Sequence, residues 1–145
     1  MISVQLIYDT EETAELDDGW LNSICKNILS DKNQDTATIS IILSNDKKLL
    51  QLKKKYFQQD ILTDVITFNL EEHSDPIEGE IYISLNRVSE NAREFKQNIE
   101  RELKRVIIHG ILHLLGYDDQ TLKEKETMTR LEDHYLSHQV VTDQI

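Results

Sequence analysis

The chain has 145 residues, of which 39% are hydrophobic and 30% are charged, a composition that fits one soluble globular domain over residues 1–145. Its formal net charge of -11 argues against a general affinity for nucleic acid, because an acidic surface repels phosphate groups. A single cysteine, no apolar run long enough for a membrane span and no secretory pattern at the N-terminus lead us to expect a cytoplasmic protein.

The first part of the chain predicts a strand followed by an amphipathic helix. Apolar residues alternate with mostly polar ones over residues 2–7, which is typical of a half-buried strand. Large apolar residues recur at helical spacing over residues 16–29 and form one apolar face. Cys25 lies on that face, so we expect its thiol to be buried.

A second strand and a second helix follow. Residues 38–43 are rich in β-branched side chains, which favour a strand. Apolar residues then recur at helical spacing over residues 49–56, and either Ser44 or Asn45 can cap the start of that helix.

The remaining strands are predicted as a hairpin. Short β-branched runs at 65–68 and 81–83 are separated by a polar loop that contains Pro76 and Gly79. From Leu85 to about Leu136 the pattern is helical. The fold class is therefore α+β, with a small mixed sheet of about four strands packed by several helices.

The most informative segment is the end of a long, apolar helix that Asn98 can cap. His109 and His113 lie four residues apart in this helix. On a helix they are displaced by about 40° around the axis and about 6 Å along it, so their imidazole rings can converge on one metal ion.

A third ligand follows where the chain turns. Gly116 is suited to the left-handed conformation that ends a helix, and Thr121 with Glu124 forms the T-x-x-E capping box that starts the next one. Asp119 falls between them, where its carboxylate can fold back toward His109 and His113. Two histidines, one carboxylate and an open position are typical of catalytic zinc, so we expect one Zn²⁺ on these three residues, at the end of a long buried helix.

Gly110 lies inside this helix, where glycine costs about 1 kcal/mol relative to alanine. Either close packing of the helix against a neighbour or clearance beside the metal could explain it, and the sequence does not separate the two.

A second histidine pair with the same spacing serves as an internal control. His134 and His138 lie in a polar terminal helix, with no glycine turn and no third ligand after them. We interpret this pair as surface residues.

The spacing H-x-x-x-H-x-x-G-x-x-D resembles that of the metzincin proteases. In those enzymes the residue after the first histidine is the glutamate that acts as general base. Here that residue is Gly110, which weighs against proteolysis.

The segment from His109 to Asp119 resembles more closely the signature H-G-x-L-H-L-x-G-Y-D-H of the YbeY family of bacterial endoribonucleases. Two further blocks resemble family motifs in the same order, LKKKYFQQDILTDVITF at 52–68 and Gly79-Glu80-Ile81. The resemblance implies a small mixed sheet packed by helices, a metal in a cleft beside the sheet, and single-strand-specific cleavage of ribosomal RNA during ribosome maturation.

The sequence departs from the family pattern at four positions. Asp119 replaces the family's third histidine, which lowers the net charge of a zinc site and leads us to expect a less acidic metal-bound water. Phe57 and Gln59 replace an arginine and a lysine, and Leu62 replaces a proline. Lys53–Lys55 could substitute for the lost charges. These lysines and the other basic clusters (Lys104-Arg105, and Arg93 with Lys96) are ordinary solvated helix faces, which permit an RNA-facing strip without requiring one.

Our leading hypothesis is a zinc-dependent endoribonuclease acting on ribosomal RNA, with the small ribosomal subunit as partner and no membrane contact. One rival is a non-catalytic, ribosome-associated maturation factor with structural zinc. Another is a metal-dependent hydrolase of a different small substrate or peptide. No catalytic residue is assigned: Asp118 is a candidate base by proximity, but a helix-capping role is equally consistent with its position. The sequence leaves the oligomeric state open.

Overall fold

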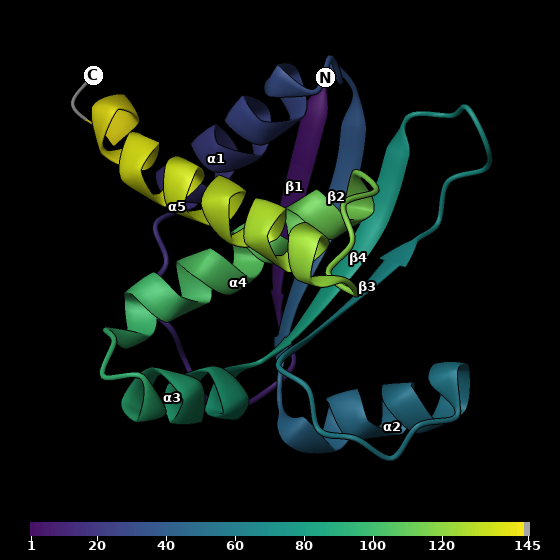
Figure 1. Ribbon diagram of the computed structural model, residues 1–145, viewed down its shortest axis with the longest axis vertical. Helices are drawn as coiled ribbons and strands as arrows, with labels where there is room; N and C mark the ends of the chain where they lie inside the picture. Colours follow the sequence, from purple (N-terminus) through teal and green to yellow (C-terminus); the bar gives the residue numbers. More distant parts are fainter. Residues whose placement is uncertain (144–145) are drawn as a thin grey trace.

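The computed structural model describes the backbone of residues 1–143 and the side chains of residues 1–137. Within this range four strands and five helices follow one another (Figure 1). Their order is β1 (Ile2–Tyr8), α1 (Asp18–Asp31), β2 (Ala37–Ser44), α2 (Asp46–Phe57), β3 (Val65–Asn69), β4 (Ile77–Ser84), α3 (Leu85–Glu94), α4 (Ile99–Leu114) and α5 (Leu122–Asp143).

The strands form one mixed sheet in the order β1-β2-β4-β3. The first three of these are parallel neighbours, and β3 pairs antiparallel with β4 as the predicted hairpin. The α+β class and the small four-stranded mixed sheet are therefore confirmed. The helices α3 and α4 follow β4 in the chain. The long helix α4 lies at the edge of the sheet that the β3–β4 hairpin forms.

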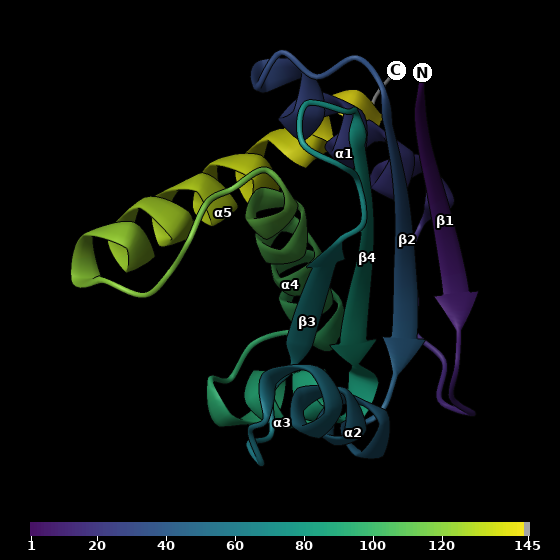
Figure 2. The ribbon, with the colours of Figure 1, turned by 90° about the vertical axis from the view of Figure 1, so that its right-hand side faces the viewer.

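The helices α1, α4 and α5 lie together on one face of the sheet, while α2 and α3 lie at the end where β2 and β4 finish (Figures 1 and 2). Alternate residues of β2 and β4 point into the layer between sheet and helices. The fully buried side chains there include Ile39, Ile41 and Leu43 of β2 and Ile81 and Ile83 of β4. This apolar layer fixes the height of α4 above the sheet.

Two glycines let α4 approach β4 closely. A Cβ atom on Gly110 of α4 would lie 2.8 Å from Cγ2 of Ile81, and one on Gly79 of β4 would lie 2.6 Å from Cδ2 of Leu114. Both distances are shorter than real contacts allow, so a larger residue at either position would force the side chain of Ile81 or Leu114 to shift. The structure therefore answers the question left open for Gly110, whose reason is helix packing against the sheet.

The strand containing Gly79 was predicted too short. We expected a strand over 81–83 with Gly79 in the preceding loop, but β4 begins at Ile77 and Gly79 is buried within it, opposite Asn69 of β3. The glycine makes room for the side chain of Leu114 above it and does not form a turn. The assignment of Gly79 to the polar loop with Pro76 was wrong because its packing partner lies far along the chain.

Two helices, α2 and α4, begin directly after the capping residues that the sequence predicted. The side chain of Asn45 accepts a hydrogen bond from the backbone N–H of Lys48 at 2.9 Å, and that of Asn98 accepts one from Arg101 at 3.2 Å. Cys25 is buried against the sheet side of α1, as expected. Among the helices within the described residues, none is long and apolar enough to cross a membrane.

Candidate metal centre

The two histidines of the centre lie on one face of α4. The buried residues of this helix surround them, and His109 and His113 are each only partly exposed. Their rings lie edge to face, with centroids 4.5 Å apart. The amide of Asn69 on β3 donates to the carbonyl of Leu114 at 2.9 Å, which ties the last turn of α4 to the sheet.

The connection between α4 and α5 brings the carboxylate back to this face. Gly116 adopts a φ of 102°, and the N–H of Tyr117 donates to the carbonyl of Leu112 at 3.1 Å, so the chain reverses as predicted. At the start of α5 the N–H of Glu124 donates to Thr121 Oγ1 and the N–H of Thr121 donates to Glu124 Oε1. Both ends of the connection are thus fixed.

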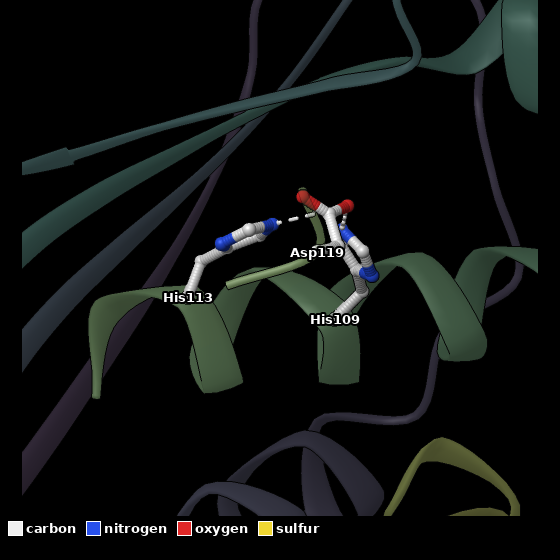
Figure 3. Close-up of side chains that lie close together, drawn as sticks. All are labelled: His109, His113 and Asp119. Atoms are coloured by element: carbon white, nitrogen blue, oxygen red, sulfur yellow. Dashed lines mark ion pairs between the residues drawn. The ribbon is translucent and has the colours of Figure 1, made fainter. Parts of the chain in front are cut away.

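The three predicted ligands come together between these fixed ends (Figure 3). Asp119 Oδ2 lies 3.4 Å from Nε2 of His109 and 3.6 Å from Nε2 of His113. One ligand atom from each residue lies within 4.8 Å of the others. Two atoms bound to one tetrahedral zinc at 2.0–2.1 Å are separated by roughly 3.4 Å, so the spacing of the carboxylate to each imidazole fits a zinc ion.

A buried carboxylate orients His109 for this role. Glu132 of α5 is 7% exposed, and its Oε2 lies 2.7 Å from Nδ1 of His109. Its other oxygen accepts a hydrogen bond from Arg105 at 2.9 Å, and Arg105 also pairs with Asp133. When Nδ1 donates to Glu132, the lone pair of His109 is on Nε2, the atom that faces Asp119.

The charges around His109 favour a cation. Burial by itself lowers the pKa of His109, but the hydrogen bond and charge of Glu132, together with Asp119 and Asp64, outweigh burial and raise the pKa overall. A site that stabilises a protonated imidazole also stabilises a metal cation at the same place.

Two hollows adjoin the three residues. The α5 hollow, of about 400 Å³, is lined by residues that include Arg105, Lys125 and Glu132, and the α2 hollow, of about 310 Å³, by residues that include Lys53 and Phe57. His109, Asp119, Asp64 and Val65 border both. Each is of the size that holds a small molecule or one unit of a polymer.

Asp64 stands where the hollows meet, at the residue before β3. Burial raises the pKa of its carboxyl, which the charge of His109 and a hydrogen bond from Asn91 only partly offset. A carboxyl of this kind can hold a proton beside the metal site. The sequence analysis assigned no role to Asp64, although it stands in the block ILTDVITF that resembles a family motif.

Glu132 was also missed, and here the local sequence carried little signal, because Glu132 is one of several acidic residues in a polar helix. Asp118, the earlier candidate base, is exposed, and its Oδ1 accepts a hydrogen bond from the N–H of Asp119 at 2.8 Å. That contact favours a local structural role for Asp118 over the role of general base. His134 is exposed on α5, as expected, and the side chain of His138 lies outside the described residues.

With this geometry established, comparison with known proteins identifies the family. The family model described as Endoribonuclease YbeY matches residues 6–139. This chain belongs to the YbeY family. A protein of Amoebophilus asiaticus named Endoribonuclease YbeY is 46% identical over 110 residues, covering 76% of this chain and 75% of the relative. A relative of the same name from Cytophaga hutchinsonii is 40% identical over 130 residues, covering 90% and 87%.

A solved structure shares the fold described here. The solution structure of a Thermotoga maritima protein superposes with a TM-score of 0.61 at 32% identity, covering 96% of this chain and 89% of that one. The family model and the named relatives confirm the sequence resemblance to YbeY over nearly the whole chain.

Proposed function

We propose that this YbeY-family chain is a zinc-dependent endoribonuclease that cleaves single-stranded RNA during maturation of ribosomal RNA, in the cytoplasm and in contact with the small ribosomal subunit. The observation that carries the proposal is the convergence of His109, His113 and Asp119 between two open hollows. The name shared by the relatives supplies the class of substrate.

Each residue of the centre has a distinct task in this proposal. His109, His113 and Asp119 would hold the zinc ion, which when bound supplies a Lewis acid for the phosphodiester group. Glu132 keeps His109 in the tautomer that leaves Nε2 available, and Arg105 keeps Glu132 in place. Asp64 is the candidate for proton transfer, because its carboxyl borders both hollows and binds its proton more tightly than an exposed aspartic acid does.

A purely structural zinc is less well supported. Structural zinc sites are normally closed by four protein ligands, whereas catalytic sites keep one position for water or substrate. The described residues near the centre offer three ligand groups, and hollows lie on both sides of them. This arrangement favours a catalytic zinc site over the structural zinc site of a maturation factor without activity.

Peptide hydrolysis by the metzincin route is also disfavoured. The position that carries the general base in metzincins is Gly110, where a Cβ atom would meet Ile81 of the sheet. A glutamate there would point into the core and would have no room. A hydrolase of this type would need its base elsewhere.

The proposal is tested by RNA cleavage with protein of measured zinc content. Wild-type protein is compared with His113→Ala on a ribosomal RNA precursor, with and without a chelator and after zinc is restored. The expected result is cleavage that follows zinc occupancy and is lost in the variant. Equal cleavage by both proteins would identify a contaminant, and no cleavage by the zinc-loaded wild type would favour the non-catalytic factor.

A further inference from the structure

The α2 hollow has an exposed aromatic ring in its wall. Phe57 is the last residue of α2, its side chain is 40% exposed, and it borders the same hollow as His109, His113 and Asp119. A single exposed phenylalanine is common on protein surfaces and needs no explanation by itself. Its neighbours show that this ring is held in a fixed position.

The ring of Phe57 is stacked against the sheet. It lies nearly parallel to the ring of Phe68 on β3, with centroids 6.0 Å apart and an angle of 26° between the planes. Phe68 is held in turn by edge contacts to Tyr56 and Tyr82, at 5.3 and 5.9 Å between centroids. Phe57 therefore belongs to a cluster of four aromatic rings, in which Phe57 and Tyr56 are exposed and Phe68 and Tyr82 are partly buried.

The end of α2 is equally well fixed. Gln58 adopts a left-handed φ of 52°, and the backbone N–H groups of Gln58 and Gln59 both donate to the carbonyl of Lys53. A ring presented by such a helix end loses little conformational freedom when a ligand contacts it, which favours binding.

A cation accompanies the ring. The Nζ atom of Lys53 lies 4.9 Å from the centroid of Phe57, and Lys53 borders the α2 hollow. The next two lysines are directed to other partners: Lys54 pairs with Asp60, and Lys55 lies over the ring of Tyr56. Lys53 has a flexible side chain, so its ammonium group can move from the ring to an anion beside it.

The hollow thus combines a flat apolar surface, a mobile cation and, at its inner wall, the metal ligands. A nucleotide has matching parts, because its base stacks on aromatic rings and its phosphate pairs with lysine. The acidic side chains of Asp64 and Asp119 border the same hollow and would repel a phosphate, and a bound zinc ion and Lys53 offset that charge.

We propose that Phe57 and Lys53 form a nucleotide subsite beside the metal centre, in which Phe57 stacks on an unpaired base of the RNA and Lys53 pairs with a phosphate. This inference rests on the proposed function and specifies it: the substrate has an unpaired base next to the cleaved bond.

The test is equilibrium binding of a short 2′-O-methyl oligoribonucleotide to zinc-loaded protein, with the oligomer checked to be intact after each titration. A second oligomer of the same length carries abasic sites and keeps the phosphates. Phe57→Ala is expected to weaken binding of the first oligomer about tenfold, the order of one lost stacking contact, and to leave binding of the abasic oligomer unchanged. Phe57→Trp should retain binding of the first oligomer, and Lys53→Ala should weaken binding of both.

The matched control is Phe95→Ala, which removes a phenyl ring that is 64% exposed at the end of α3 and lies outside both hollows. Zinc content and the thermal unfolding midpoint establish that each variant is folded. If Phe57→Ala binds as well as wild type while wild type cleaves RNA, the subsite is wrong and the proposed function stands. If zinc-loaded wild type neither binds nor cleaves RNA, the proposed function fails and the subsite fails with it.

Discussion

Glu132 and His109 are 23 residues apart in the chain, yet the carboxylate of the first lies 2.7 Å from Nδ1 of the second. The contact joins α5 to α4 at the level of the metal centre. It also connects the centre to Arg105, which holds Glu132 and Asp133 at the same time. The position of His109, the first proposed ligand, therefore depends on the docking of α5.

This relationship predicts a loss of metal affinity when Glu132 is removed. Glu132→Ala should lower the affinity for zinc by about 10- to 100-fold, because partners that orient a metal-binding histidine typically contribute that much. Asp133→Ala is the matched control, since it removes a partner of Arg105 that is not the partner of His109. Zinc competition with a chromophoric chelator measures both. Equal affinities for the two variants would show that Glu132 does not support the centre.

Asp64 is predicted to affect turnover and not metal binding. Asp64→Asn keeps the size of the side chain but removes its ability to accept a proton, so kcat for RNA cleavage should fall by about 10²- to 10⁴-fold, with zinc content unchanged. Asp118→Asn, at an exposed carboxylate that accepts a hydrogen bond from the backbone of Asp119, should change kcat much less. Similar losses of kcat in both variants would show that Asp64 is not the proton-transfer group.

The close approach of α4 to β4 predicts an energetic coupling between Gly110 and Ile81. Gly110→Ala should destabilise the protein by about 1–3 kcal/mol through overpacking, even though alanine favours a helix by about 1 kcal/mol. Ile81→Ala removes the atoms that the new methyl group would meet. In the double variant the loss of unfolding free energy should therefore be clearly smaller than the sum of the two single losses. Urea denaturation measures all three, and strict additivity would contradict the packing explanation.

The caps, and the approach of His109, His113 and Asp119 to one another, could be predicted from the sequence because the partners are near in the chain. Asn98, Gly116 and the pair Thr121–Glu124 act within a few residues of themselves, and the positions of the ligands follow from the helix and its turn. Glu132 could not be predicted, because its contact depends on how α5 packs across α4. The strand role of Gly79 was missed for the same physical reason, since its partner is a side chain on a distant helix.

The buried thiol predicts a stability difference at alkaline pH. Burial raises the pKa of Cys25 to about 12 in the folded protein, against about 8.5 in an unfolded chain. Because the folded pKa is the higher one, the stabilising contribution is complete below about pH 8.5 and is lost as the pH rises toward 12. At about pH 10 the expected loss is about 2 kcal/mol relative to neutral pH.

The comparison that isolates this effect is wild type against Cys25→Ala in urea denaturation over a series of pH values. The alanine variant carries a constant loss from the smaller side chain, but its unfolding free energy should fall less steeply above about pH 8.5. Parallel curves for the two proteins would mean that Cys25 ionises as readily in the folded state as in the unfolded state.

The proposed function depends on a zinc site formed by His109, His113 and Asp119. The most direct measurement of that site is the zinc content per chain after dialysis against limiting free zinc. Wild type and His134→Ala should each retain one ion, because His134 is exposed on α5 away from the three ligands. Alanine at any one of the three ligand positions should reduce the content sharply. Full zinc occupancy in the His109, His113 and Asp119 variants, or an equal loss in His134→Ala, would contradict the site and the function built on it.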